Sequence, residues 1–156
     1  MDNEYYMNLA LEQAKLAYAE GEVPVGCVIV GAGGELIGTG RNRVAREGNA
    51  LRHAEIIAID EACAKVGDWR LSEAVLFVTV EPCPMCAGAI IMSRINSVVY
   101  GAENRKAGCA GSIFNILDEP RFNHRVNIVR GVRAEECGAL MTAFFRKYLS
   151  KGANGR

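Results

Sequence analysis

The chain alternates helical and strand patterns from end to end, and this alternation constrains its fold more than any other feature. Helical segments carry apolar residues every three or four positions, and short apolar runs lie between them. The predicted helices span 2–20, 53–65, 83–93 and 134–149, and the predicted strands span 24–30, 35–40, 74–80, 97–100 and 127–130. Strands interleaved with helices predict an α/β fold, a three-layer α/β/α sandwich around a five-stranded mixed sheet.

Three connections between these elements stand out. Glycines within 31–34 predict a tight turn that joins the first two strands as a hairpin. Residues 41–52 form a polar stretch with four arginines. Residues 101–126 form a long connection with a short helix predicted at 112–117, and connections of this length commonly carry function.

Composition points to one globular domain. The chain has 156 residues, 50% apolar and 23% charged, unlike disordered, collagen-like or coiled-coil proteins. No apolar run approaches the roughly 18 residues that a membrane span requires, and the first residues lack the pattern of a signal peptide. We therefore expect a soluble cytoplasmic protein that does not enter the membrane, with one domain over 1–150 and a flexible tail over 151–156.

The charges balance overall but are unevenly distributed. Residues 1–80 hold 7 basic and 12 acidic residues, a net charge of −5, whereas residues 81–156 hold 11 and 6, a net charge of +5. The composition is not that of a strongly basic nucleic-acid-binding protein. A folded chain can still present one basic face, so a nucleic-acid partner and an evenly mixed surface are both open interpretations.

The six cysteines divide into two kinds. Without a signal peptide we expect no disulfide framework, because cytosolic thiols stay reduced. Four cysteines lie among apolar or small residues and are expected to be buried: Cys27, Cys63, Cys109 and Cys137. Cys83 and Cys86 instead form a Cys-x-x-Cys pair, a spacing typical of metal or redox sites.

Two short motifs carry the candidate chemistry, and each begins a predicted helix: His53-Ala54-Glu55 and Pro82-Cys83-Pro84-Met85-Cys86. Cysteines three apart at a helix start present both sulfurs on one face, where the helix N-terminus favours the thiolate. With His53 they offer zinc three ligands and leave one position for water. Zinc lowers the pKa of such a water to about 7, and Glu55 is placed to move a proton as a general acid and base.

Each motif alone has an ordinary alternative. A Cys-x-x-Cys pair is also typical of thioredoxin-like redox proteins, although no aromatic residue precedes Cys83. A histidine at a helix start is more often a surface or capping residue than a ligand. The joint occurrence of the two motifs favours zinc over both alternatives.

The combined pattern H-x-E…P-C-x-x-C is the signature of zinc nucleobase deaminases, and the chain resembles the bacterial tRNA adenosine deaminases over nearly its whole length. The matching segments are EVPVG (22–26), GRNR (40–43), HAE (53–55), WRL (69–71), VEPCPMCAGA (80–89), GCAGS (108–112), FNH (122–124) and EEC…FFR (135–146). They extend well beyond the metal signature, which cytidine deaminases share.

The resemblance implies a cytidine-deaminase-like fold and hydrolysis of adenosine to inosine at the wobble position of a tRNA anticodon stem-loop. It implies that His53, Cys83 and Cys86 hold Zn²⁺ and that Glu55 is the catalytic proton shuttle. It also implies a homodimer in which both subunits contribute to the RNA surface.

The resemblance further implies a set of substrate-binding residues. Asn42 would hydrogen-bond the flipped-out base, Pro24 and Val25 would form an apolar wall, and Asn104 would lie near the ribose. The residues implied along the path of flanking nucleotides are Lys106, Asn123, Phe144 and Phe145. Core packing is an equally weighted alternative for each phenylalanine, and an ordinary solvated lysine is the alternative for Lys106.

Three positions depart from the family pattern. Asn104 stands where the family usually has Asp, and we hypothesise that the lost charge relaxes discrimination against single-stranded DNA, because RNA differs from DNA by its 2′-hydroxyl. Arg52 replaces a small residue and is interpreted as facing solvent or contacting phosphate. The chain after Arg146 has fewer basic residues than the family, which predicts weaker, less salt-dependent RNA binding.

Two rival functions follow from the same residues. One is a deaminase of a free base or nucleoside, for example guanine. The other is a non-catalytic, zinc-stabilised RNA-binding module, against which Glu55 argues because a structural zinc site needs no proton shuttle. The ligand set would also accept iron or cobalt in vitro.

Overall fold

The computed structural model describes the backbone of residues 1–155 and the side chains through Leu149. The elements in chain order are α1 (Asn3–Ala19), β1 (Gly26–Val30), β2 (Leu36–Arg41), α2 (Val44–Glu47), α3 (Ala54–Val66), β3 (Val75–Val80), α4 (Pro84–Met92), β4 (Ser97–Ala102), the 3-10 turn η1 (Ile116–Asp118), β5 (Asn127–Val129) and α5 (Ala134–Gly155). None of the helices within this part of the chain combines the length and apolar character needed to span a bilayer.

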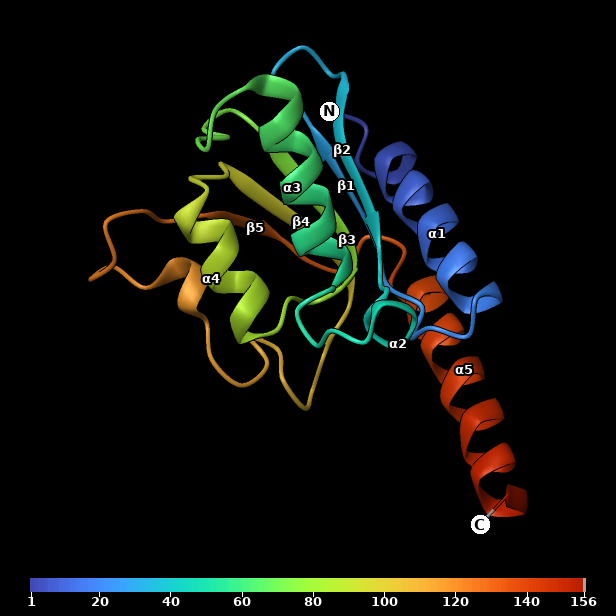
Figure 1. Cartoon of the computed structure of the whole chain (residues 1–156). Coiled ribbons are helices and arrows are strands. Elements are labelled where there is room, and N and C mark those ends of the chain that lie inside the picture. The colour runs from blue at the N-terminus through green and yellow to red at the C-terminus, as the bar shows by residue number, and fades with distance from the viewer. Residues whose placement is uncertain (156) are drawn as a thin grey trace.

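The five strands form one mixed sheet in the order β2-β1-β3-β4-β5. β1 pairs with β2 and β3 in antiparallel register, whereas β3, β4 and β5 run parallel to one another. Helices α3 and α4 cover one face, and α1 and α5 cover the other (Figure 1). The predicted α/β/α sandwich with a five-stranded mixed sheet is therefore confirmed.

The central strands are apolar on both faces, which explains their uninterrupted hydrophobic runs. On β1, Cys27 and Ile29 pack into the core beneath α3 and α4, whereas Val28 and Val30 pack with α1. On β3, Leu76 and Val78 join the first of these cores, and Phe77, which is fully buried, joins the second. Two apolar cores thus hold the sheet between its helices.

Two glycines on β2 allow α3 to approach the sheet closely. A Cβ on Gly40 would overlap the carbonyl oxygen of Ala54 and lie 2.8 Å from the nitrogen of Ala58. A Cβ on Gly38 would overlap the carbonyl of Ala58 one turn later. Only the absence of side chains at these positions lets the start of α3 rest on the sheet.

The structure differs from the sequence prediction in the connections. The polar stretch 41–52 contains the short helix α2, which has too few residues to show a periodic pattern. The helix predicted at 112–117 is wrong in its placement, because the segment holds only the turn η1 at Ile116–Asp118. The predicted flexible tail, residues 151–156, lies beyond the described side chains and stays a prediction.

Candidate active site

The starts of two helices bring three potential metal ligands together. His53 is the N-cap residue of α3, Cys83 is the N-cap residue of α4, and Cys86 lies in the first turn of α4. The Nδ1 atom of His53 lies 3.6 Å from the Sγ of Cys83 and 3.4 Å from the Sγ of Cys86. Their donor atoms all lie within 4.8 Å of one another, so this group could hold a metal ion.

Hydrogen bonds within this cluster lower the pKa of the Cys83 thiol and raise that of the Cys86 thiol. The hydrogen bond with Cys86, together with those to His53, lowers the pKa of the Cys83 thiol well below its usual range despite partial burial. The hydrogen bond with Cys83 raises the pKa of His53. Pro84 at the start of α4 leaves the helix N-terminus intact, because a first-turn residue needs no N–H partner. A thiolate beside an imidazole is a donor set that zinc prefers.

Glu55 lies in the first turn of α3, two residues after His53, and is only 3% exposed. Burial raises the pKa of its carboxyl group to about 7. A carboxyl group with such a pKa can both accept and release a proton near neutral pH. Glu55 thus has the placement and acidity of a general acid and base.

A cavity of about 310 Å³ opens beside these residues. Its lining includes His53, Glu55 and Cys83 together with three residues that the sequence analysis implied as substrate contacts: Val25, Asn42 and Asn104. Asn42 is only 7% exposed and reaches the cavity from the end of β2. Small-molecule sites occupy about 300–1,000 Å³, so this cavity suits one base better than a larger group.

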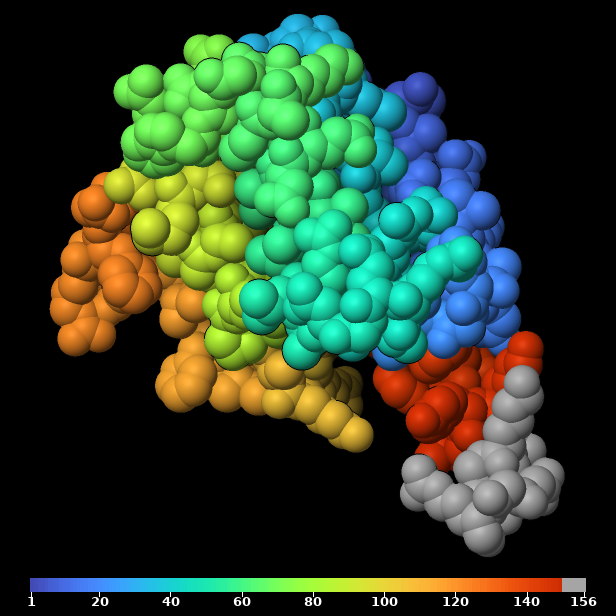
Figure 2. Space-filling view, in the orientation of Figure 1, coloured from blue at the N-terminus to red at the C-terminus, as the bar shows by residue number. Residues whose placement is uncertain are grey.

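A second, wider cavity of about 940 Å³ adjoins the first and shares Val80, Asn104 and Met141 with it. It lies between the segment after β4 and helix α5. Figure 2 shows the lower edge of the molecule hollowed between this segment, in gold, and α5, in red. Lys106 and Phe145, both exposed, line it together with Arg105 and Arg130.

The remaining implied contacts do not line these two cavities within the described part of the chain. Pro24 is buried beside Val25, and Asn123 is exposed between η1 and β5. Phe144 is half-buried and turns toward α1, where its ring centroid lies 6.0 Å from that of Tyr18 in a T-shaped arrangement. Phe145 packs edge-on against Phe144, with ring centroids 5.4 Å apart, and it also lines the wider cavity.

Arg52 neither reaches into the cavity nor extends freely into solvent. Its Nη1 donates to Asp60 at 3.2 Å, and its Nε lies 3.4 Å from Glu47. These ion pairs link the segment before His53 to α2 and α3.

Sequence reasoning missed several lining residues: Val23, Val44, Val80, Glu81 and Met141. The four apolar ones carry no distinguishing signal, because valine and methionine are ordinary core residues. Glu81 stands in the VEPC segment, and a charged residue directly after a buried strand is a signal that could have identified it.

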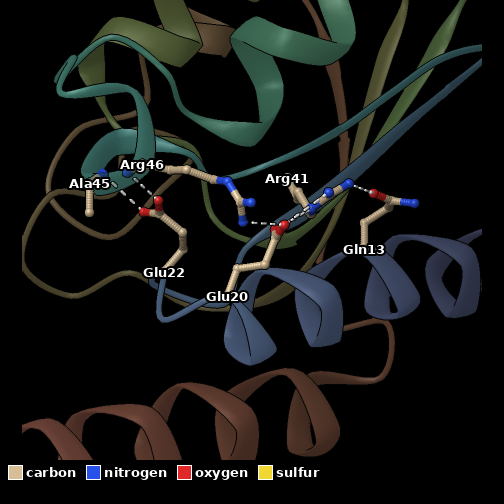
Figure 3. Close-up of polar contacts among 6 residues, drawn as sticks. All are labelled: Gln13, Glu20, Glu22, Arg41, Ala45 and Arg46. Carbon is tan, nitrogen blue, oxygen red and sulfur yellow. Dashed lines mark hydrogen bonds and ion pairs between the residues drawn. The ribbon is translucent and has the colours of Figure 1, made fainter.

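A polar network holds one wall of the smaller cavity in place (Figure 3). Glu22, which is 3% exposed, accepts the backbone N–H groups of Ala45 and Arg46 at 3.0 and 2.6 Å. Glu20 accepts from Arg41 and Arg46, each at 2.6 Å. The segment that carries Val23 and Val25 is thereby tied to the segment that carries Asn42 and Val44.

Known proteins are similar to this chain in sequence. A model of the MafB19-like deaminase family matches residues 1–148. The tRNA-specific adenosine deaminase of Bacillus subtilis (strain 168) is 49% identical over 149 residues, which cover 96% of this chain and 92% of that protein. The tRNA-specific adenosine deaminase of Haemophilus influenzae is 43% identical, with 93% and 84% covered.

Solved structures of deaminases are similar to this chain in fold. One structure, from work on A-to-I editing by tRNA:A34 deaminases at the wobble position of transfer RNA, superposes with a TM-score of 0.83 at 37% identity, covering 87% of this chain and 98% of that chain. A guanine deaminase from Nitrosomonas europaea superposes with a TM-score of 0.75 at 26% identity, covering 90% and 83%.

Proposed function

This chain belongs to the family of the tRNA-specific adenosine deaminases, and from that premise we propose that it hydrolyses the wobble adenosine of tRNA anticodon loops to inosine. One observation carries the proposal: the His53, Cys83 and Cys86 cluster opens into a base-sized cavity that also contains the buried carboxyl group of Glu55. A cluster that served folding alone would need neither the cavity nor the carboxyl group.

His53, Cys83 and Cys86 would hold Zn²⁺. Their two sulfurs and one nitrogen match the ligands that zinc prefers, and three protein ligands leave one position open, as in catalytic rather than structural sites. When bound, zinc activates water as a nucleophile at neutral pH.

The chain's own residues transfer the protons and bind the base. Glu55 takes a proton from the attacking water, which adds to C6 of adenine, and it delivers a proton to the departing N6 amine. The C6–N6 bond breaks, so that adenosine and water give inosine and ammonia. The amide of Asn42 hydrogen-bonds the base, and Val25 forms an apolar wall that excludes bulk water.

The wider cavity would take the nucleotides that flank the adenosine. Anticodon loops present unstacked bases, which proteins bind by stacking and by phosphate contacts. Phe145 is 42% exposed and offers a stacking surface, while Lys106 and Arg105 offer positive charge. The roles implied for Pro24, Asn123 and Phe144 stay predictions.

We further propose a homodimer in the cytoplasm, where its tRNA substrate is found. Four large apolar side chains are exposed on α4 and on the segment around η1: Met92, Ile113, Phe114 and Phe122. Large exposed apolar side chains occur at protein interfaces, so these four are the candidates for the dimer contact. A molar mass near twice 16.9 kDa in light scattering would support the dimer, and a monomer mass at micromolar concentration would contradict it.

A second candidate function is deamination of a free purine base. The likeness to a guanine deaminase favours it, as does a cavity large enough for one base. This candidate requires no contact with flanking nucleotides and therefore no role for Lys106 or Phe145.

The deciding experiment compares substrates on metal-loaded protein. Ammonia release is measured on an anticodon stem-loop RNA with a wobble adenosine, beside its all-DNA counterpart, free adenosine and free guanine, and inosine formation is confirmed in the RNA. Turnover of the RNA that Glu55→Ala abolishes, and that Glu61→Gln at an exposed position of α3 preserves, is the expected result. Turnover of the free compounds alone would favour the second candidate, and no turnover at all would favour a non-catalytic RNA-binding module.

A further inference from the structure

The side chain of Glu81 is 2% exposed and accepts four hydrogen bonds from a single loop. Its Oε1 accepts the N–H of Asn104 at 3.1 Å and the hydroxyl of Ser112 at 2.5 Å. Its Oε2 accepts the N–H groups of Ala110 and Ser112, both at 3.0 Å. All four donors are neutral and belong to residues 104–112, which we call the 104–112 loop.

The loop folds tightly around this carboxylate. A Cβ on Gly108 would overlap both the carboxyl group of Glu81 and the carbonyl oxygen of Asn104. The N–H of Cys109 donates to the carbonyl of Pro82 at 2.9 Å. Residues 81–82 therefore hold the loop through both a side chain and the backbone.

Asn104 is the point where this loop meets the candidate active site. Asn104 lines both cavities, and its Oδ1 accepts the N–H of Ala107 at 3.1 Å. Its own N–H is held by Glu81. Lys106 lies two residues further along the same loop and lines the wider cavity. Cys83 follows Glu81 by two residues. One short stretch of chain therefore carries a candidate metal ligand and also, through Glu81, holds the part of the cavity wall that Asn104 forms.

We propose that Glu81 is a positioning residue, which holds the Asn104 wall of the cavity at a fixed place relative to the metal ligands. The inference rests on the proposed function, since that function states what the cavity binds. Glu81 acts on the substrate through Asn104 and the 104–112 loop.

The variant Glu81→Gln tests this arrangement selectively. A glutamine amide has one oxygen and one NH₂ group, so one side of the group must face its neighbours as a donor. The Oε2 side meets two backbone N–H groups, which can only donate, so the amide oxygen is expected there. On the other side the Ser112 hydroxyl can turn and accept, but the N–H of Asn104 cannot. Glutamine should therefore release Asn104 first and leave the rest of the loop bound.

We expect Glu81→Gln to raise KM for the stem-loop RNA about tenfold, the effect of one lost hydrogen bond to a charged group. It should leave kcat within about twofold, because an interaction that acts on binding alone changes KM. In an Asn104→Ala background the same substitution should raise KM by less than about a further twofold, because the effects of two substitutions that act through one contact are not additive.

Two variants control for general disruption. Gly108→Ala crowds the Oε2 side of the Glu81 carboxyl group and the carbonyl oxygen of Asn104 without changing the charge of Glu81, and it should raise KM in the same way. Glu61→Gln makes the same chemical change at an exposed position of α3 and should change nothing. A fall in kcat and bound metal for Glu81→Gln, equal in both backgrounds, would show a purely structural role and overturn the proposal.

Hydrogen exchange separates this inference from the proposed function. Glu81→Gln should speed exchange of the Asn104 amide by about tenfold or more, while amides of α1 keep their rates. If the unmodified protein converts no RNA, the proposed function fails, and the exchange result alone then decides whether Glu81 positions Asn104. Unchanged exchange at Asn104 overturns it whatever the activity.

Discussion

The carboxylate of Glu22 lies 2.6 Å from the backbone nitrogen of Arg46, although 24 residues separate them in sequence. It also binds the N–H of Ala45, and together these contacts hold the start of α2 (Figure 3). Arg43, the N-cap residue of α2, provides no side-chain hydrogen bond of its own. Glu22 therefore supplies from a distance the cap that this helix lacks.

The first prediction concerns that cap. Glu22→Ala should lower the free energy of unfolding by about 1–3 kcal/mol, the cost of leaving backbone donors without an acceptor. It should also raise KM, because Asn42 and Val44 line the cavity beside α2. Urea denaturation and steady-state kinetics check both effects, with Glu12→Ala at an exposed position of α1 as the control. Equal kinetics for the two variants would contradict the link between α2 and the cavity.

The second prediction concerns metal removal. Because His53 occupies the N-cap position of α3 and Cys83 that of α4, a bound metal would join the two helix starts. At a concentration of unbound metal about 100 times the Kd, metal binding would stabilise the fold by about 2.7 kcal/mol. A chelator should therefore lower the Tm of the metal-loaded protein and leave that of Cys83→Ser nearly unchanged. Cys63→Ser, outside the cluster, should respond like the unmodified protein, and an equal chelator effect in all three would argue against this site.

The third prediction concerns the choice between RNA and DNA. Asn104→Asp restores the residue usual in the family and keeps an oxygen for the N–H of Ala107. The ratio of RNA to DNA turnover should rise about fivefold, as one hydrogen bond contributes about 1 kcal/mol. Asn127→Asp, exposed on β5, adds the same charge away from the cavities and should leave the ratio unchanged. Identical ratios for Asn104→Asp and the unmodified protein would refute this role of Asn104.

The fourth prediction tests the close approach of α3 to β2. Gly40→Ala should destabilise the fold by about 1–3 kcal/mol, because overpacking forces the backbone to shift. The shift would fall on Ala54, next to His53, so bound metal should decrease as well. Gly88→Ala on α4 has open space around its Cβ and should be neutral or stabilising. Thermal unfolding and the amount of bound metal are measured for both variants. Equal values for Gly40→Ala and Gly88→Ala would show that β2 tolerates a side chain at residue 40.

The sequence could predict those parts of the molecule that depend on local patterns. The strands β1 and β3 appear as apolar runs, and His53, Cys83 and Cys86 stand at helix starts that could be predicted by themselves. The segments 42–47 and 104–112 could not be predicted, because carboxylates more than 20 residues away hold them. Phe144 and Phe145 are neighbours in sequence, yet a step of about 100° along a helix turns one toward Tyr18 and the other into the cavity.

The fifth prediction concerns the end of α4. Arg94 follows the C-cap residue Ser93 and has a φ of 61°, a left-handed conformation that usually favours glycine. The Arg94 N–H donates to the carbonyl of Ile91 and the Ile95 N–H to that of Ile90, which satisfies two of the last carbonyls of the helix.

The arginine side chain offsets part of the conformational cost. Its Nη1 donates to the carbonyl of Ile91 at 2.9 Å, and its guanidinium lies 5.8 Å from the ring centre of Trp69. Arg94→Ala loses these contacts and keeps the strain, whereas Arg94→Gly loses the contacts and removes the strain. Arg94→Gly should therefore be more stable than Arg94→Ala by about 1 kcal/mol.

Urea denaturation of both variants measures this difference. Gly67→Ala isolates the conformational cost, because Gly67 has a φ of 71° and no neighbour within 4 Å of its Cβ position. The loss of stability in Gly67→Ala should match the difference between the two Arg94 variants. If Arg94→Ala and Arg94→Gly unfold at the same urea concentration while Gly67→Ala is destabilised, the left-handed conformation of Arg94 carries no such cost.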